Sequence, residues 1–248
     1  MSGAEMPELS SAELYAAVAR DLAETAGVAP TLEQLVGHAV LLVPCDWAAA
    51  LAAQHISARP SRWSASSDPQ LLATVAEIAA AAGNSPGTMA FQDGRVVMSA
   101  DLTTEKRFTG YASEMVRRTP IRSVLSFGLV LQDETLGVLT LYSRSSHAFD
   151  DHATARGSVL ADHAAIAIEG SLLADRAENL EEALESNRLI GMATGILVER
   201  HKLTAQQGFA LLRTASQHSN RKLVDVAESL VATGEVPSFG RRPMPESA

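Results

Sequence analysis

Metal-ligating and titratable side chains gather at one place in this sequence of 248 residues, between positions 147 and 152. His147 and His152 flank Asp150 and Asp151 there, and these residue types can bind transition metals. Metal ligands must converge on one point, however, and this cluster stands where a helix is predicted to begin. Capping and the helix dipole then account for the aspartates. We therefore expect no metal site and no cofactor.

No other group of residues has the spacing of a catalytic site. The sequence has neither a phosphate-binding G-x-x-x-x-G-K-[ST] loop nor a G-x-S-x-G nucleophile turn. Its only cysteine, Cys45, can form no disulfide within the chain and cannot support a thiol cycle that needs several cysteines. We expect Cys45 to be a small apolar residue at the start of a strand. The sequence predicts that the protein is not an enzyme.

The distribution of charge separates the C-terminal part of the chain from the rest. The formal charge is −9 overall, but residues 1–185 carry −12, with 12 Lys/Arg against 24 Asp/Glu. Residues 186–237 carry +2, and residues 238–248 carry +1. A charge of +2 is smaller than the strongly basic surface of most nucleic-acid-binding proteins, so charge alone leaves an ordinary solvated helical surface as an alternative.

The chain shows no N-terminal signal sequence and no apolar run long enough to cross a membrane. We expect a soluble cytoplasmic protein with one medium-sized domain and a smaller appendage.

Residues 186–237 have the apolar periodicity of three short helices, of which the first runs from about residue 187 to 201. Thr204 and Gln207 predict a capping box for the second helix, in which the segment's only aromatic residue, Phe209, is expected to lie in the core. Ser219 or Asn220 can cap the third helix, and the glycine at 234 is expected to close it. About fifty residues bury little surface alone, so we expect this bundle to rest on a partner or on a long helix that enters it.

The same segment resembles the ANTAR domain, a small helical RNA-binding module of transcription antiterminators. The resemblance is carried by R-L-I-G-x-A-x-G-I-L-V-E-R in the first helix, F-x-L-L-R-x-x-S in the second, and N-x-K-L-x-D-V-A with T-G-x-x-P in the third. It implies binding to paired short hairpins in nascent RNA, which stabilises an antiterminator fold. Many family members carry Lys where this chain has Thr194, a difference that would weaken RNA binding or change the element bound.

Basic and small polar residues are the candidates for RNA contact, because the segment lacks an aromatic platform on which bases could stack. Gly191 and Gly195 leave a smooth strip on the first helix, which suits close approach to RNA and packing against another helix equally well. Arg213, Asn220 and Lys222 match the family pattern. The full set of candidate RNA-binding residues is Arg188, Thr194, Gly195, Arg200, Lys202, Arg213, Ser216, Asn220, Arg221 and Lys222.

The residues before this segment predict an α+β domain built on an antiparallel sheet, without the regular strand–helix alternation of α/β proteins. A hairpin is expected from strands 123–131 and 136–143, which flank the loop at 132–135. The other expected strands are 45–54, 56–64 and 96–99, with a turn at 92–95. Helices are expected at 11–27, 30–43, 68–82 and 106–118, and a long helix follows residue 151.

Residues 31–170 resemble a GAF domain, a sensor module with a central antiparallel sheet and helices at its side. The resemblance is carried by V-L-S-F-G-L-V-L-x(4)-L-G-V-L-T-L-Y-S-x(5)-F-D-D, the closing hairpin and helix start of that fold. It implies a small ligand whose identity the sequence does not give. The large side chains that could line a cavity, or form plain core, are Trp47, Trp63, Phe91, Met98, Phe108, Tyr111 and Phe127.

A heptad pattern between the two segments predicts a connecting helix. One seam position holds Ile166, Leu173, Leu180 and Asn187, and the other holds Gly170, Ala177, Leu184 and Gly191. Three heptads with a partly small seam make a short parallel coiled coil; the alternative is a single amphipathic helix that packs on its own sheet. We predict a homodimer whose interface includes Leu173, Ala177, Leu180 and Leu184.

The sequence thus predicts five parts: a helical extension (1–30), a GAF-like sensor domain (31–165), a coiled-coil connector (166–187), an ANTAR RNA-binding domain (188–237) and a disordered tail (238–248). The predicted function is transcription antitermination, with the sensor controlling the RNA-binding module. The alternative is a signal-responsive regulator whose helical module binds a protein partner instead of RNA.

Overall fold

The computed structural model describes residues 11–56 and 59–235, so the tail expected at 238–248 lies outside the described residues. The chain divides into two compact units, residues 1–175 and 176–248. The first unit contains α1 (Ser11–Glu24), α2 (Val28–Leu42), β1 (Trp47–Ile56), β2 (Arg59–Ser66), α3 (Pro69–Ala82), α4 (Pro86–Asp93), β3 (Val96–Ser99), α5 (Thr109–Arg118), β4 (Ser123–Leu131) and β5 (Glu134–Ser143). Helix α6 (Asp151–His201) starts in the first unit and ends in the second, where α7 (Ala205–Ser219) and α8 (Leu223–Thr233) follow it.

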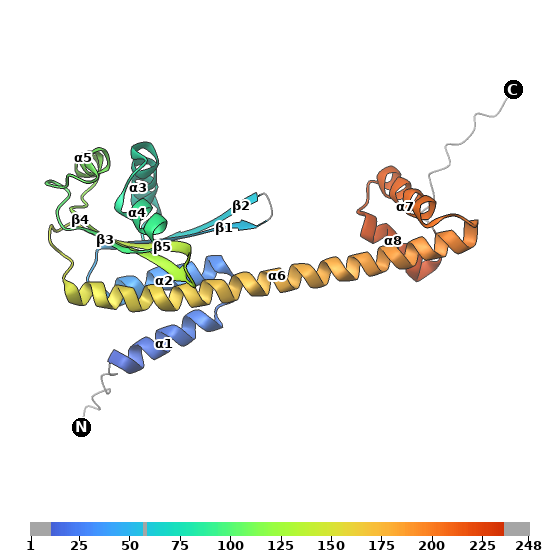
Figure 1. The fold of residues 1–248 in the computed structure, drawn as a ribbon, viewed down its shortest axis with the longest axis horizontal. Coiled ribbons are helices and arrows are strands. Elements are labelled where there is room, and N and C mark those ends of the chain that lie inside the picture. Colours follow the sequence, from blue (N-terminus) through green and yellow to red (C-terminus); the bar gives the residue numbers. More distant parts are fainter. Residues whose placement is uncertain (1–10, 57–58, 236–248) are drawn as a thin grey trace, which may run out of the picture. The chain divides into compact units, whose positions relative to one another are not determined.

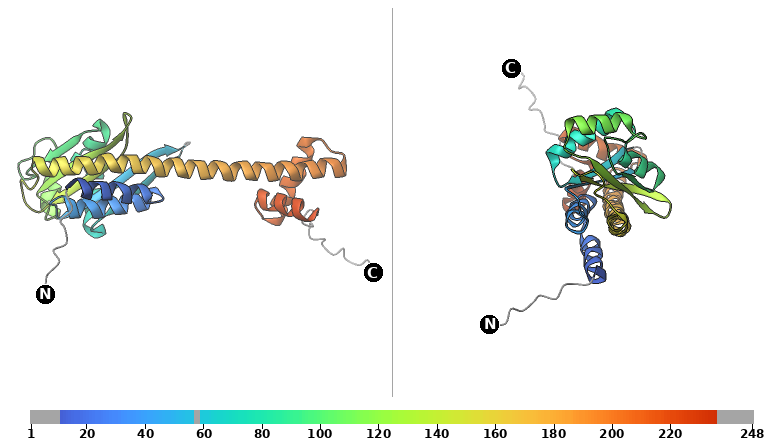
Figure 2. Two further views of the ribbon diagram at one scale, coloured as in Figure 1. Left: turned by 90° about the horizontal axis from the view of Figure 1, so that it is seen from below. Right: turned by 90° about the vertical axis from the view of Figure 1, so that its left-hand side faces the viewer.

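The five strands form one sheet in the order β2-β1-β5-β4-β3, and every neighbouring pair is antiparallel (Figure 1). This confirms the predicted α+β class with an antiparallel sheet. Helices cover both faces of the sheet: α2 and the first part of α6 lie on one face, and α3, α4 and α5 lie on the other (Figures 1 and 2).

Alternate residues of each strand point to opposite faces, so the two helical layers are held by two separate cores. On β4, Leu125, Phe127 and Leu129 are buried against α2 and α6, whereas Val124 belongs to the core beneath α3, α4 and α5. The long helix can lie close to β4 because residue 157 of α6 is a glycine: a Cβ there would collide with the Phe127 ring.

Local signals explain most helix boundaries. The Asp68 carboxylate accepts a hydrogen bond from the Leu71 N–H at 3.0 Å and caps α3, which ends at a left-handed glycine as expected. Helix α4 is not among the expected helices, because its Pro and Gly residues resemble a turn. The Ser85 hydroxyl accepts from the Thr88 N–H at 3.1 Å and caps it.

The hairpin of β4 and β5 is tighter than predicted. Only Gln132 and Asp133 form its loop, with φ of 49° and 68°, and β5 begins at Glu134. A two-residue turn with positive φ at both positions matches the right-handed twist of the strands it joins. The expected four-residue loop is therefore wrong.

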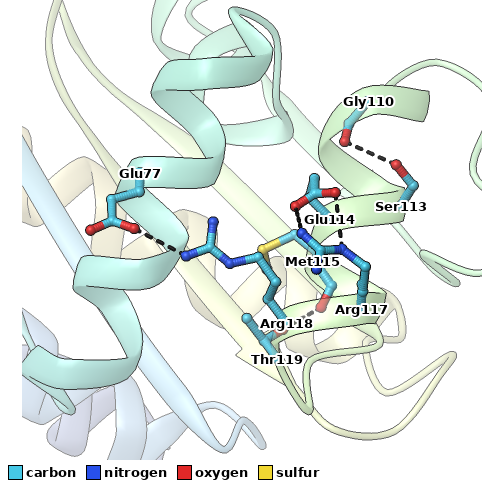
Figure 3. A network of polar contacts seen from close by, with 8 residues as sticks. All are labelled: Glu77, Gly110, Ser113, Glu114, Met115, Arg117, Arg118 and Thr119. Atoms are coloured by element: carbon cyan, nitrogen blue, oxygen red, sulfur yellow. Dashed lines mark hydrogen bonds and ion pairs between the residues drawn. The ribbon is translucent and has the colours of Figure 1, made fainter.

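Side chains also tie α5 to its surroundings, as Figure 3 shows. The Arg118 guanidinium pairs with the Glu77 carboxylate of α3 at 3.0 Å, and the Thr119 hydroxyl donates to the Met115 carbonyl at 2.7 Å, where α5 ends. The buried Met115 side chain anchors the same helix in the core. Since Arg118 and Glu77 are both partly exposed, the packing of Met115 contributes more than the ion pair.

Helix α6 begins as the sequence predicts. The Asp150 carboxylate accepts a hydrogen bond from the Ala153 N–H at 2.7 Å, and this bond holds the pKa of Asp150 below its usual value. Within the described residues, no three His, Cys, Asp or Glu side chains are grouped so that they could hold a metal ion. Over the same residues, no helix is both long enough and apolar enough to span a membrane.

Candidate nucleic-acid interface

The second unit is a three-helix bundle made by the end of α6, by α7 and by α8. Its core is small and aliphatic: the fully buried side chains are Ala193, Leu197, Leu212, Ala215, Val226, Ala227 and Leu230. The first of the three predicted helices is the last part of α6, and its predicted end at His201 is confirmed.

The turns on either side of α7 are built from residues with positive φ. Lys202 (φ 52°) ends α6, and the following N–H of Leu203 donates to the Val198 carbonyl at 3.1 Å. Asn220 (φ 52°) ends α7 in the same way, so the expectation that it caps the third helix is wrong. Asparagine tolerates this conformation better than most residues do, which explains its presence at the turn.

The start of α7 agrees with the sequence. The Thr204 hydroxyl accepts from the Gln207 N–H, and the Gln207 side chain accepts from the Thr204 N–H at 2.9 Å, which confirms the predicted capping box. Helix α8 starts at Leu223 after Lys222, and neither Ser219 nor Asn220 caps it. The Ser216 hydroxyl instead donates to the Arg221 carbonyl at 2.7 Å and braces the turn before α8.

Thr194 lies where α6 and α7 approach each other closely. A Cβ at Gly208 would stand 3.0 Å from Val198 Cγ2 and 3.2 Å from the Thr194 carbonyl oxygen, so any larger residue would force these neighbours to shift by a few tenths of an ångström. The Thr194 hydroxyl is buried and has no hydrogen-bond partner in the described residues. The expectation that Thr194 contacts RNA disagrees with this position, because the hydroxyl is shielded from solvent.

The strip formed by Gly191 and Gly195 is open. A Cβ added at either glycine would meet no side chain and no other helix within 4 Å. The sequence allows two uses for this strip, helix packing and close approach to RNA. The strip does not pack against another helix of the bundle.

Four of the six candidate basic residues are already held by groups of the protein. The Arg188 guanidinium pairs with Glu185 at 2.7 Å, and the Lys202 ammonium pairs with Glu199. The remaining two donate hydrogen bonds to backbone carbonyls. Arg200 donates to the carbonyl of Gly234, and Arg221 donates to the carbonyl of Asp225 at 3.2 Å and to the Ser229 hydroxyl at 3.0 Å.

Arg213 and Lys222 differ from these four. Both side chains are exposed, and neither makes a hydrogen bond or an ion pair within residues 11–56 and 59–235. They are also the two basic residues of the second and third helical segments that match the ANTAR pattern. Of the ten candidate residues, these two are the cations that have no polar partner in the part of the chain that the structure describes.

The charge of the second unit is concentrated around α7. Residues 200–224 contain five Lys/Arg and no Asp/Glu, whereas Glu199 and Asp225 stand just outside this stretch. Helix α7 itself has no acidic residue, and residues 178–185 of α6 contain four glutamates. The total charge of the segment hides this contrast, although the run without acidic residues is visible in the sequence.

Phe209 lies on the surface of α7, with 41% of its area exposed. The prediction that it belongs to the core is wrong. The buried positions of α7 are Gly208, Leu212 and Ala215, and Phe209 points about 100° away from the first of these around the helix. Close packing of α6 at Gly208 leaves the ring on the solvent side.

The predicted seam of α6 is exposed over its whole length. Leu173, Leu180 and Leu184 are 52%, 62% and 61% exposed, and every residue from 176 to 185 is exposed. A different face of α6, which includes Leu160 and Ile168, packs on the sheet. The alternative of an amphipathic helix packed on its own sheet therefore holds for the first turns of α6 but not for residues 176–185.

The large side chains proposed to line a cavity in the first unit do not come together. Phe127, with Trp63 and Met98, belongs to the core beneath α2 and α6, while the other four belong to the opposite core: Trp47, Phe91, Phe108 and Tyr111. The face under α4 carries hydroxyls instead, where Ser126 and Thr140 share a hydrogen bond of 3.1 Å. Of the two possibilities, plain core is the one that the structure supports, because adjacent strand positions face opposite sides and divide these side chains between two cores.

Cys45 lies in the loop two residues before β1 and not within a strand as expected. Burial, together with the neighbouring Asp46 carboxylate, raises the pKa of the Cys45 thiol to about 11. A thiol with this pKa is almost entirely protonated at neutral pH and is a poor nucleophile.

Comparisons with known proteins agree with both units. The family profile of the GAF domain matches residues 31–169, and that of the ANTAR domain matches residues 178–231. Comparison with curated protein sequences gave no significant match.

Similar solved structures include the GAF domain of an Acinetobacter phosphoenolpyruvate-protein phosphotransferase, at 13% identity and a TM-score of 0.50, covering 66% of this chain and 97% of that one. Another is the free methionine-R-sulfoxide reductase of Neisseria meningitidis, at 14% identity and a TM-score of 0.49, covering 70% of this chain and 99% of that one. At these identities the first likeness shows the fold alone. The chain is therefore a member of the GAF domain family that also carries a C-terminal ANTAR domain, and it has the architecture of a GAF–ANTAR regulator.

Proposed function

We propose that the protein is a transcription antitermination regulator whose ANTAR domain binds paired hairpins in nascent RNA under the control of the GAF domain. The observation that carries this proposal is the charge around α7: five basic residues and no acidic one between 200 and 224. Arg213 and Lys222 are exposed there without a protein partner in the described residues, and are therefore available to phosphate groups.

The remaining candidates take supporting roles in this proposal. Ser216 and Asn220 hold the turn after α7, whereas Arg221 donates to residues of α8 and Arg200 to the glycine that closes α8. Arg188 and Lys202 can exchange their exposed glutamate partners for phosphate, because such ion pairs contribute little to stability. Gly195 lies on the open strip of α6, where a nucleic-acid backbone can come close.

The proposal includes a homodimer joined along α6. Three leucine side chains are exposed at heptad spacing on α6: Leu173, Leu180 and Leu184. They favour pairing with α6 of a second copy, because the two apolar seams would then be buried against each other. Two ANTAR domains in one dimer then match two hairpins in one transcript. In this arrangement residues 31–165 form the sensor domain, 166–187 the coiled-coil connector and 188–237 the RNA-binding domain.

The GAF domain acts as a regulatory and not a catalytic part in this proposal. A small ligand bound to it, of a class that we leave open, would change the availability of the ANTAR domain. The protein works where transcripts are made, which in this proposal is the cytoplasm.

The test is a titration of the full-length protein against RNA with two adjacent short hairpins, at a series of salt concentrations. A control RNA keeps the stems and has scrambled loops. We expect tighter binding to the intact loops and an affinity that falls as salt rises. Equal affinity for both RNAs would contradict the proposal and leave a protein partner as the function of the helical module.

A further inference from the structure

The ring of Phe209 is not part of the buried core of the three-helix bundle. The bundle core is aliphatic, and the ring stands 41% exposed on α7, turned about 100° around the helix from the buried Gly208. Single exposed apolar residues are common on protein surfaces, so exposure alone assigns no role. Its surroundings supply the second observation.

Helix α7, which carries the ring, contains a basic residue and no acidic one. Arg213 lies four residues after Phe209 and therefore on the same side of α7, one turn away. The Arg213 side chain has no hydrogen bond or ion pair in the described part of the chain. Other residues on this exposed side are neutral: Gln206, Ala210 and Gln217. An aromatic face beside an unpaired guanidinium offers a stacking surface for a base and a positive charge for its phosphate.

The helix holds this pair in place. Gly208 packs directly against α6, and the Thr204–Gln207 capping box fixes the first turn of α7 just before it. The ring therefore projects from a rigid backbone with only two side-chain torsions to restrict on binding, which lowers the entropic cost of ordering it.

We infer that Phe209 is the base-stacking residue of this ANTAR domain: its ring stacks on one unpaired base of a hairpin loop while Arg213 binds the adjacent backbone phosphate. This inference rests on the proposed function and adds to it a specific contact with single-stranded loop bases. Unpaired loop bases are the part of an RNA hairpin that an aromatic side chain can reach, since paired bases are already stacked.

The test compares Phe209→Leu with the wild-type full-length protein on the two-hairpin RNA. Leucine keeps an apolar side chain on the helix but removes the ring, and we expect affinity to fall by about five- to a hundredfold, the range for loss of one base stack. The salt dependence of binding should stay the same, because no phosphate contact is lost; Arg213→Gln should lower the salt slope instead. Phe209→Tyr should retain affinity. Leu41→Met, at an exposed apolar residue of α2 in the first unit, is the control and should bind as the wild type does.

A second arm identifies the base. RNAs with an abasic site at each loop position in turn are titrated with both proteins. At one position the abasic change should weaken wild-type binding as much as Phe209→Leu does, and the two changes together should cost no more than either alone.

Three outcomes would overturn the inference while wild-type RNA binding is intact. One is an unchanged affinity of Phe209→Leu. Another is additivity of this variant with every abasic site. The third is a change in the oligomeric mass of the variant, which would assign the ring to a protein contact. Failure of the wild-type protein to distinguish the two-hairpin RNA from its scrambled control would instead overturn the proposed function itself, and this inference with it.

Discussion

The basic residues of the ANTAR domain differ in whether a group of the protein already binds them. Arg200 donates to the backbone carbonyl of the glycine that closes α8, and Arg221 donates to a backbone carbonyl in its first turn. Arg213 and Lys222, by contrast, have no partner in the described residues. A side chain that already stabilises the fold is expected to affect RNA binding indirectly, through the shape of the bundle. Replacing a side chain without such a partner is expected to affect RNA binding directly, without changing the bundle.

We therefore expect Arg213→Gln and Lys222→Gln each to weaken RNA binding several-fold and to reduce the salt slope by about one. The bundle should remain folded, because neither side chain has a polar contact to lose among the described residues. Titrations at several salt concentrations, with circular dichroism of each variant, measure both effects. Lys106→Gln makes the same change in net charge in the first unit and serves as the control. A loss of affinity as large in Lys106→Gln would show that total charge, and not this face, governs binding.

A single carboxylate in the GAF domain predicts a dependence of stability on pH. The hydrogen bond from the Arg107 guanidinium lowers the pKa of Glu105 to about 2, and the Glu105 side chain is only 8% exposed. Because the pKa in the folded state lies below the usual value near 4.3, the pair stabilises the fold above that value. This stabilisation is lost as the pH falls from about 5 towards 2.

Glu105→Gln should therefore lower the free energy of unfolding at pH 7 by about 1–2 kcal/mol, a value reduced because Arg107 is half exposed. The difference from the wild type should shrink as the pH approaches 2. Urea unfolding followed by tryptophan fluorescence measures it, since Trp47 and Trp63 both lie in the first unit. Glu114→Gln breaks an exposed pair with Arg117 and should have almost no effect. If the difference in unfolding free energy between Glu105→Gln and the wild type did not change with pH, the Glu105–Arg107 pair would not be the source of the pH dependence.

At the scale of elements, the hairpin of β4 and β5 carries a cost that a substitution can remove. Gln132 and Asp133 both adopt positive φ, which is unfavourable by about 1 kcal/mol or more for residues with a Cβ. Asn-Gly is the preferred pair in such turns. The double substitution Gln132→Asn with Asp133→Gly should raise the free energy of unfolding of the first unit by about 1 kcal/mol.

The same fluorescence experiment measures this change. Glu134→Gly is the control, because residue 134 already belongs to the strand and gains nothing from glycine's freedom at positive φ; it should lower stability. If the double substitution and Glu134→Gly both stabilise the protein, or if neither does, positive φ in the turn is not what lowers its stability.

At the scale of the whole molecule, the proposed dimer links RNA affinity to the seam of α6. Leu180→Asp with Leu184→Asp places charges at two exposed seam positions and should make the protein monomeric. Binding to a two-hairpin RNA should then weaken at least tenfold, while binding to a single hairpin should change little, because the monomer loses the effective concentration of the second domain.

Sedimentation of the variant and titrations with both RNAs measure the two effects. Glu182→Ala, on the side of α6 opposite to the seam, is the control and should remain dimeric. A wild-type protein that sediments as a monomer, with no preference for two hairpins over one, would contradict the dimer.

Local interactions are what the sequence determined by itself. Helix caps and helix-ending glycines depend on residues only a few positions away. The Asp68 cap, the Thr204–Gln207 capping box and the end of α8 at Gly234 were therefore predictable. The strands of the α+β sheet and the ANTAR and GAF patterns were predictable as well. Helix α4 is an exception although its cap is local, because Pro86 and Gly87 are as common in turns as in a first helical turn.

Only the tertiary structure decided which side of an element meets the rest of the chain. The close approach of α6 to Gly208 puts Phe209 in solvent and buries the Thr194 hydroxyl, and contacts with distant residues occupy Arg200 but leave Arg213 without a partner in the described residues. The two faces of the sheet likewise divide large side chains that the sequence could only group by type. These outcomes depend on contacts between residues far apart in the chain, and the periodicity of a single helix or strand contains no information about them.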